Sequence, residues 1–329
     1  MRQAILYGAG DLRMEERPLG PERLEPTQVY VETEVTALST GTDLGNYLGN
    51  STDIPGAPDY PRAVGYSNVG IVREVGAQVK TLRAGQRVFS LKPHQSAYIA
   101  QDSDLLVAVP DGIAPEHASL AYLAQLGMAA MRQARYESGE SVAVVGLGVI
   151  GLGTVAIARA MGATVTAIAN SPLRAGVARQ IGAEQVYVAG EGDAPSGIDV
   201  VILTANPWSA FRMSVDIARA GGRLSILGFP GRGEPPPDFN PLDPTWFYGK
   251  QLTLIGAGFS PRVECPPSDV RFNLRRNLEY LFSLMATGRI CLEPLITHRI
   301  PAERMQDAYE MARQHSKSLI AAIFDWRSA

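Results

Sequence analysis

Three glycines stand at a spacing that suits a phosphate-binding turn. Gly146, Gly148 and Gly151 follow the apolar run "SVAVV" directly, and the segment "GLGTVAIARAMG" that begins at the third glycine has the pattern of a helix. Glycine allows a tight turn and a close approach of the backbone to a ligand, and the first N–H groups of a helix attract an anion. The pattern predicts that a dinucleotide pyrophosphate contacts Gly146, Gly148, Val149, Ile150 and Gly151. The alternative is a glycine-rich turn without a ligand.

The turn after the next apolar run, "TVTAIA", indicates which dinucleotide binds. An NAD site usually has an acidic residue about 20 residues after the glycines, and this chain has Ala169 at that place. Asn170 and Ser171 can donate hydrogen bonds to a 2′-phosphate, and Arg174 can neutralise its charge. We therefore expect NADP(H). The same residues also suit an ordinary helix start, with Ser171 as the N-cap and Arg174 in solvent.

Strands that alternate with helices must position these residues. The predicted strands are the short apolar runs "SVAVVG", "TVTAIA", "QVYVA", "IDVVILTA", "GRLSILG" and "LTLIGA", with helical segments between the first three. Such alternation is typical of a doubly wound parallel sheet, the Rossmann architecture. Thr204 and Gly228 lie at the ends of two later runs and complete the expected cofactor-binding set.

The first part of the chain has a different pattern. Runs such as "QVYVETEV" and "SNVGIVREV" are rich in strand-forming residues and are separated by Gly- and Pro-containing turns, which predicts a β-rich, barrel-like unit. An Ala-, Leu- and Met-rich helical run, "APEHASLAYLAQLGMAAMRQARY", marks the change of character. The later segment "GFPGRGEPPPDFNPLDPTWFYGK" suits either a packed surface loop or a lid that faces the substrate.

Composition limits the classes of function. The 329 residues, 46% of them hydrophobic, suffice for two domains. A formal charge of −3 without a basic stripe argues against a nucleic-acid partner. No uncharged apolar stretch is long enough to span a bilayer, so we expect a cytoplasmic protein without a membrane partner. The two cysteines, Cys265 and Cys291, form no disulfide framework or CxxC pair and are expected to be free thiols.

Several segments together resemble the medium-chain dehydrogenase/reductase superfamily. They are "ALSTGTDL", "GYSNVGIVREVG", "LRAGQRVFS", "AVVGLGVIGLGTVAIARAMGA" and "LITHRIP", and the likeness runs nearly end to end. It implies an α/β protein with a GroES-like catalytic domain (1–121), a Rossmann NADP-binding domain (122–270) and a C-terminal segment (271–329) that completes the catalytic domain. It also implies a homodimer or homotetramer. The turn "ANSPLR" is similar to the "S-x-S-P-x-K" pattern of NADP-dependent cinnamyl alcohol dehydrogenases.

The chain departs from the zinc members of that superfamily at the metal ligands. Thr40 stands in place of the catalytic cysteine, Tyr66 and Ser67 replace the histidine and glutamate of a "GHE" motif, and the third ligand position falls near Ala124 or Gln125. None of these is a good zinc ligand. The four-cysteine structural lobe is also missing, so we expect no metal. The sequence looks most similar to a zinc-lacking branch that includes the bacteriochlorophyllide 2-hydroxyethyl dehydrogenases.

Catalysis without zinc needs another group to stabilise the oxygen that gains negative charge. Tyr66 is the first candidate acid, and Thr42 matches the hydroxyl that relays a proton in the zinc relatives. Thr40 and Thr42 also suit simple turn hydroxyls, and Tyr66 suits a buried tyrosine bonded to backbone. Asp43 is expected to orient its neighbours. His94 would either donate to the substrate or lie in solvent.

Three functions are compatible with these residues. The leading hypothesis is an NADP(H)-dependent, zinc-independent oxidoreductase that interconverts a carbonyl and a secondary alcohol of a small-molecule metabolite. The second is an NADPH-dependent reductase of activated C=C bonds, although the zinc-free quinone and enoyl reductases usually have AxxGxxG in place of GxGxxG. The third is a catalytically silent NADPH-binding protein. Cofactor binding without turnover would favour the third.

Overall fold

The chain forms two compact units in the computed structural model, which describes residues 1–20, 23–49, 59–258 and 272–327. Unit 1 consists of Met1–Tyr122, Leu278–Thr287 and Ile296–Ala329, and unit 2 consists of Leu123–Asn277 and Gly288–Leu295. Cys265 lies outside the described residues, whereas Cys291 is an exposed free thiol. No described helix is long and apolar enough to cross a membrane.

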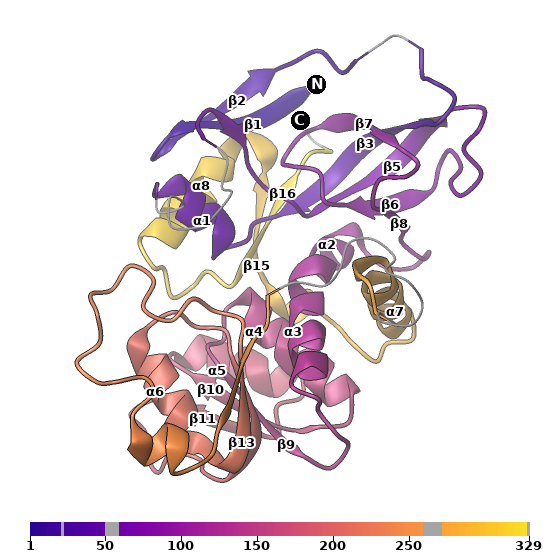
Figure 1. Cartoon of the computed structure of the whole chain (residues 1–329). Coiled ribbons are helices and arrows are strands. Elements are labelled where there is room, and N and C mark those ends of the chain that lie inside the picture. The colour runs from indigo at the N-terminus through magenta and orange to yellow at the C-terminus, as the bar shows by residue number, and fades with distance from the viewer. Residues whose placement is uncertain (21–22, 50–58, 259–271, 328–329) are drawn as a thin grey trace. The chain divides into compact units, whose positions relative to one another are not determined.

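Unit 1 is built on two β-sheets (Figure 1). The larger sheet has the strand order β15-β16-β3-β5-β6-β8, with β7 also paired to β3, and the smaller has the order β2-β1-β4. The strands of unit 1 are β1 (Arg2–Gly8), β2 (Asp11–Glu16), β3 (Gln28–Ala37), β4 (Arg62–Ala63), β5 (Asn68–Val75), β6 (Arg87–Ser90), β7 (Ala97–Gln101), β8 (Leu106–Ala108), β15 (Ile296–Pro301) and β16 (Ala321–Asp325).

Strand β3 shows why these residues form a half-buried sheet. Val29, Val31 and Val35 are buried, while Glu32 and Glu34 alternate with them on the other face. Side chains of a strand point to opposite faces in turn, so this period of two places the valines in the core. The buried valines of β3 and β5 then pack with Tyr98 of β7.

Short helices and one long helix complete unit 1. They are α1 (Thr42–Tyr47), α2 (Pro115–Ser119), the 3₁₀ turn Ala302–Arg304, α8 (Met305–Arg313) and, from Leu278 onward, α7 (Leu274–Ala286). Helix α8 buries Met305, Ala308, Tyr309 and Ala312 on one face. That face joins a core with Tyr47 and Phe324, so the C-terminal residues pack with the N-terminal strands.

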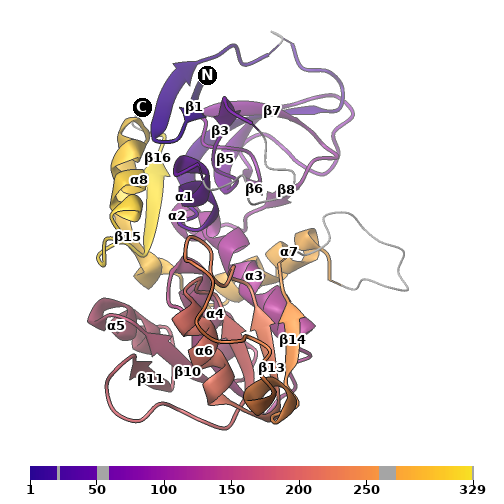
Figure 2. The ribbon, with the colours of Figure 1, turned by 60° about the vertical axis from the view of Figure 1, so that its left-hand side comes forward.

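Unit 2 is a six-stranded parallel sheet of order β11-β10-β9-β12-β13-β14, with helices beside it (Figure 2). Its elements are α3 (Ala121–Gln133, in this unit from Leu123), β9 (Ser141–Val145), α4 (Val149–Ala160), β10 (Thr164–Ala169), α5 (Pro172–Gln180), β11 (Gln185–Val188), β12 (Ile198–Leu203), α6 (Trp208–Ile217), β13 (Ala218–Ile226), a π-helical turn (Pro244–Tyr248), β14 (Thr253–Gly256) and the 3₁₀ turn Glu293–Leu295. The predicted fold class, a β-rich domain with a doubly wound parallel sheet, is confirmed.

The Pro- and Gly-rich segment after β13 packs at least partly on unit 2. Phe239 and Trp246 are half-buried, and their ring centroids lie 6.0 Å apart. Phe239 also meets Trp208 edge-on at 6.2 Å and stacks on Phe211 at 6.5 Å. Tyr248, in contrast, is 80% exposed. The half-buried Phe239 and Trp246 therefore favour the packed-loop interpretation, whereas Phe229, Leu242 and Tyr248 of the same segment are exposed.

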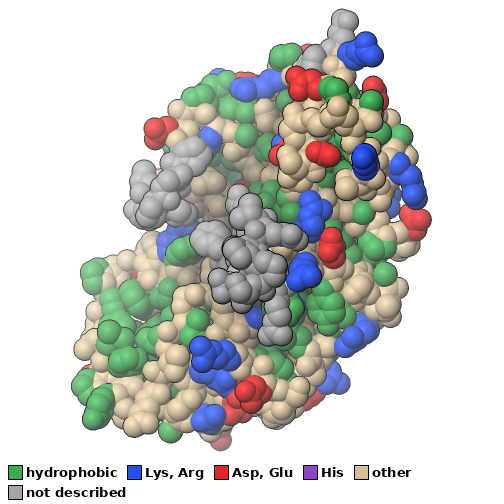
Figure 3. All heavy atoms as spheres, turned by 45° about the vertical axis from the view of Figure 1, so that its right-hand side comes forward, with side chains coloured by type: hydrophobic (Ala, Val, Ile, Leu, Met, Phe, Trp, Pro, Cys, Tyr) green, Lys and Arg blue, Asp and Glu red, His purple; other side chains and the backbone are tan. Residues whose placement is uncertain are grey.

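The surface carries both signs of charge. On the face shown in Figure 3, the Lys and Arg side chains are interspersed with Asp and Glu. Many of the described charges form ion pairs, such as Arg87 with Glu34 at 2.6 Å and Arg219 with Asp199 at 2.6 Å. The distribution agrees with the small net charge of −3.

Candidate active site

Tyr66 lies in unit 1, between β4 and β5, at the centre of a group of hydroxyls. Its phenol donates a hydrogen bond to Ser39 Oγ and forms a further hydrogen bond with Thr42. Its ring meets that of Tyr122 edge-on, with centroids 5.3 Å apart. Burial and the nearby charge of Asp43 raise the pKa of Tyr66, while the two hydroxyl partners act in the opposite direction. The phenol therefore keeps its proton at neutral pH and can act as an acid.

Asp43 is a buried carboxylate held by two backbone N–H groups. Oδ2 accepts from the N–H of Ser39 at 2.9 Å, and Oδ1 accepts from the N–H of Gly65 at 3.2 Å. Burial raises the pKa of Asp43 to about 6, although the two N–H bonds act against this rise. Asp43 thus connects the turn after β3 to the turn that carries Tyr66, and its orienting role stays a prediction.

His94 is fully buried, so the prediction that it could lie in solvent is wrong. Its backbone N–H donates to the Val64 carbonyl at 2.8 Å, and Nδ1 lies 2.8 Å from Thr36 Oγ1. The ring fits because Gly65 has no side chain: a Cβ there would lie 2.6 Å from the imidazole. Burial lowers the pKa of His94 to about 3, which keeps the ring neutral.

The second ring nitrogen of His94 faces Asp43. Nε2 lies 3.8 Å from Asp43 Oδ2 and has no hydrogen-bond partner within the described part of the chain. At that distance the two groups interact without a direct hydrogen bond. The position of His94 thus favours support of Asp43 over contact with a substrate.

The structure gathers most of the predicted catalytic residues. Thr42, Asp43, Tyr66 and His94 form one connected group, and the half-buried Thr40 occupies the same turn as Thr42. Ser39, which sequence reasoning did not select, contacts both Tyr66 and Asp43. No sequence signal distinguishes Ser39 from the other hydroxyl residues of its turn, because the contact depends on a turn that is distant along the chain.

The residues at the expected metal positions do not form a zinc site. Thr40 and Tyr66 are neutral hydroxyl residues, and Ser67 Oγ already donates to the carbonyl of Ser119 at 2.5 Å. Over the residues that the structure describes, no three His, Cys, Asp or Glu side chains lie together as a metal would require. Zinc prefers thiolate, imidazole and carboxylate ligands, so this donor set does not fit it.

The glycine turn of unit 2 connects β9 to α4. Gly146 has a φ of +95°, which favours glycine. A Cβ on Gly151 would lie 1.8 Å from the Gly146 carbonyl oxygen, so this helix start packs directly on the turn. A Cβ on Gly148 would meet nothing within 4 Å, which leaves open space before the helix N-terminus. Gly148 provides no side-chain cap, so N–H groups of the first turn of α4, which contains Val149 and Ile150, can receive a phosphate.

Thr204 supports this turn from the end of β12, and Gly228 lies beside the next residue, Ala205. Thr204 Oγ1 donates to the Gly146 carbonyl at 2.6 Å, and a Cβ on Gly228 would lie 2.6 Å from the Ala205 carbonyl oxygen. Thr204 therefore holds the glycine turn in place, and Gly228 allows two backbone segments to approach each other.

The turn after β10 serves as a helix start. Ser171 is buried and is the N-cap of α5, accepting from the backbone N–H of Arg174 at 3.5 Å. Asn170 is exposed, and Arg174 is half-buried. Burial lowers the pKa of Arg174, which still remains a cation. The capping interpretation thus describes the backbone of this turn, and the binding of a 2′-phosphate by Asn170 and Arg174 stays a prediction.

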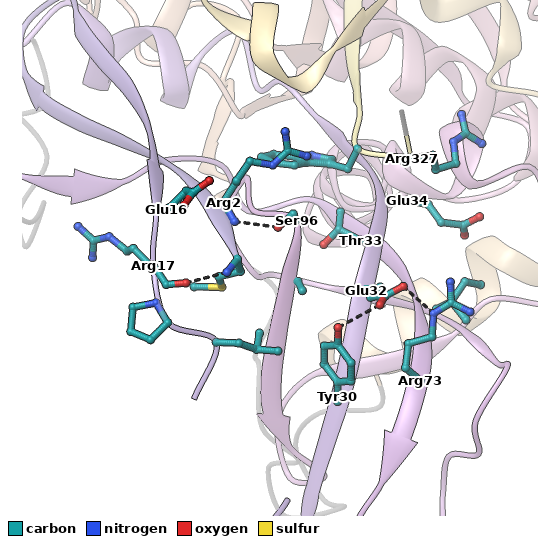
Figure 4. A pocket seen from close by; sticks show the side chains of 16 residues that line it. Arg2, Glu16, Arg17, Tyr30, Glu32, Thr33, Glu34, Arg73, Ser96 and Arg327 are labelled. Carbon is teal, nitrogen blue, oxygen red and sulfur yellow. Dashed lines mark hydrogen bonds and ion pairs between the residues drawn. The ribbon is translucent and has the colours of Figure 1, made fainter. Parts of the chain in front are cut away.

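A surface groove of about 1060 Å³ in unit 1 is separate from these residues (Figure 4). Within it, Tyr30 donates to Glu32, which pairs with Arg73 at 2.7 Å. None of the predicted catalytic residues lines the groove. Its acidic and basic side chains partly neutralise one another, so its size alone does not make it the candidate active site.

Comparison with known proteins supports this interpretation of the fold. Residues 25–153 match the alcohol dehydrogenase GroES-like domain, and residues 149–272 match the zinc-binding dehydrogenase family. The sorbitol dehydrogenase of Bacillus subtilis (strain 168) is 23% identical over 363 residues, covering 98% of this chain and 96% of the relative. The chain belongs to the medium-chain dehydrogenase/reductase superfamily. It is therefore an oxidoreductase of the alcohol dehydrogenase type.

Solved structures of similar fold cover nearly the whole chain. The galactitol-1-phosphate dehydrogenase from Escherichia coli has a TM-score of 0.81 at 21% identity, covering 99% of this chain and 100% of its own. A structure from Sinorhizobium meliloti 1021 with bound NADP has a TM-score of 0.80 at 21% identity and covers 98% of both chains. At this identity the superposition supports the superfamily's fold and does not transfer a substrate.

Proposed function

We propose that this protein is an NADP(H)-dependent, zinc-independent oxidoreductase that interconverts a ketone and a secondary alcohol of a small metabolite. The observation that carries the proposal is the state of Tyr66. It stands where zinc relatives have a ligand, holds its proton at neutral pH, and is oriented by Ser39 and Thr42. A protonated phenol can do by hydrogen bonding and proton donation what a Lewis acid does by charge.

The cofactor is held by residues of unit 2. The N-terminus of α4 with Gly148 receives the pyrophosphate, and Asn170 and Arg174 bind the 2′-phosphate, with no acidic side chain at Ala169 to repel it. When bound, NADPH supplies the hydride. The turn fits this ligand because a side chain at Gly148 would extend into the space that the pyrophosphate needs.

Tyr66 completes the reduction by donating one proton. The carbonyl carbon gains the hydride, the C=O π electrons move to oxygen, and the Tyr66 O–H bond breaks to give the alcohol and a tyrosinate. The tyrosinate regains its proton from solvent at the end of the cycle. Asp43 holds the turn that carries Tyr66, and the neutral His94 supports Asp43.

The substrate class follows from the relatives only by analogy. The names sorbitol dehydrogenase and galactitol-1-phosphate dehydrogenase describe polyol chemistry in those proteins. By this analogy we propose a hydroxyl-bearing ketone as the substrate class. We further propose a homodimer or homotetramer, since β14 is an edge strand of its sheet and can pair across a twofold axis.

The test combines binding, metal analysis and turnover on one preparation. Calorimetric titration with NADPH and NADH should show tighter binding of NADPH, and metal analysis should find at most trace zinc. A panel of hydroxyketones should be reduced, and Tyr66→Phe should lower kcat at least about 100-fold, whereas the control Tyr30→Phe should not. Stoichiometric zinc, preferred NADH binding, or reduction of enones alone would each overturn part of the proposal.

A further inference from the structure

We infer that Ser39 is the positioning residue of this site: it orients the Tyr66 phenol and stabilises the tyrosinate that remains after proton transfer. The inference rests on the proposed role of Tyr66 as the acid. Ser39 lies in the turn between β3 and α1, is only 2% exposed, and belongs to none of the expected ligand or relay positions. Its two contacts give it a role that its neighbours do not share.

The first contact is with the reacting group itself. Ser39 Oγ accepts the hydrogen bond of the Tyr66 phenol. A serine hydroxyl carries one hydrogen and two lone pairs, and it can rotate about its Cβ–Oγ bond. It can therefore accept from the neutral phenol before the reaction and donate to the phenolate afterwards. No other atom of Ser39 has to move for this change.

The second contact fixes Ser39 relative to Tyr66 through Asp43. The backbone N–H of Ser39 donates to Asp43 Oδ2 at 2.9 Å, and the backbone N–H of Asp43 donates back to the Ser39 carbonyl at 2.9 Å. The other carboxylate oxygen accepts from Gly65, the residue before Tyr66, at 3.2 Å. Ser39, Asp43, Gly65 and Tyr66 thus form a closed ring of contacts, which holds the donor and acceptor oxygens together.

The charges around Tyr66 explain why an anion there needs this partner. The phenol faces the Asp43 carboxylate from α1, the Tyr122 ring from α3 and the Tyr309 hydroxyl from α8. Each of the three, when ionised, opposes a second negative charge at Tyr66. Thr42 supplies one hydrogen bond that favours the anion, and Ser39 supplies the other. A hydrogen bond to a charged group is worth more than one to a neutral group.

The test measures the ionisation of position 66 directly. A fluorinated tyrosine is placed at position 66 of the full chain so that the phenol ionises while the protein is folded, and its titration is followed by ¹⁹F NMR. Ser39→Ala should raise this pKa by about one unit and lower kcat about tenfold at unchanged KM. Ser39→Thr keeps the hydroxyl and should restore both values. Ser39→Cys, a weaker hydrogen-bond partner, should give intermediate values.

Ser67→Ala is the matched control for the loss of a buried serine hydroxyl. Ser67 lies next to Tyr66 but donates to the Ser119 carbonyl, so its removal should leave the position-66 pKa unchanged. An unchanged pKa in folded Ser39→Ala or Ser39→Cys would overturn the inference. If Tyr66→Phe keeps full activity while the Ser39 variants still shift the pKa, the proposed acid role fails but the positioning contact stands. The two failures are therefore distinguishable.

Discussion

At the scale of single residues, the protonation state of Tyr66 determines how the reaction depends on pH. Its pKa is raised mainly by burial, so the phenol is an acid over the neutral range. We predict that kcat for ketone reduction stays level from about pH 6 to about pH 10, because a phenol whose pKa lies above its usual value of about 10 keeps its proton over that range, while alcohol oxidation increases with pH over the same interval because it requires the tyrosinate. Initial rates in both directions check this. Parallel profiles for the two directions would contradict it.

His94 gives a second prediction at this scale, on stability. Burial lowers its folded-state pKa to about 3, and the unfolded value is about 6.5. Below pH 6.5 the unfolded chain therefore binds a proton at His94 that the folded chain does not bind. The stability that comes from the neutral, buried imidazole is fully present above pH 6.5 and is lost as the pH falls toward 3. Asp43 has the opposite effect on stability over part of that range. Because its folded-state pKa is raised to about 6, its contribution to stability increases as the pH falls.

Replacing His94 should therefore change the slope of stability against pH. Between pH 6.5 and pH 4, the free energy of unfolding of His94→Gln should increase by about 3 kcal/mol relative to that of wild type. The reason is that the unfolded variant has no imidazole at position 94 that could bind a proton. Urea unfolding at several pH values measures the difference. Curves that remain parallel would show that the imidazole is protonated in the folded protein.

At the scale of secondary structure elements, the sequence predicted what local rules determine. The glycine turn before α4 and the six strands of unit 2 follow from spacing and apolar runs, and all are present. The helical run after residue 114 is divided at Leu120 into α2 and α3, which its composition does not indicate. The burial of His94 and the contacts of Ser39 depend on pairing of distant strands and turns, which no local pattern contains.

The glycine turn allows fold and ligand binding to be separated. In Gly151→Ala the new Cβ would lie 1.8 Å from the Gly146 carbonyl oxygen, so the turn must shift, and we expect a loss of about 1–3 kcal/mol in stability together with weaker NADPH binding. Gly148→Ala meets no protein atom within 4 Å. It should keep the stability of wild type and still lose at least about tenfold in NADPH affinity. Urea unfolding and calorimetric titration check the pair; equal affinities in Gly148→Ala and wild type would place the pyrophosphate elsewhere.

At the scale of the whole molecule, we propose that the two units divide the chemistry between them. The candidate acid and its supports all belong to unit 1, and the predicted cofactor residues all belong to unit 2. Unit 1 is assembled from three separate segments of the chain. Its last strand, β16, lies between β15 and β3, where Phe324 pairs with Thr36. Strand β16 thus pairs with the last residues of β3, the strand that leads into the Ser39 turn.

Phe324 tests this division. Its side chain is fully buried, stacks on Tyr309 at 6.3 Å and meets the His94 ring edge-on at 5.0 Å. Phe324→Ala should cost unit 1 about 3–5 kcal/mol and lower kcat through the His94 and Asp43 contacts. NADPH affinity should change less than about twofold, because Phe324 lies outside unit 2.

Leu203→Ala is the opposite control. Leu203 is a buried residue beside Thr204, and its replacement should weaken NADPH binding. Loss of NADPH binding in folded Phe324→Ala would show that unit 1 holds the cofactor as well.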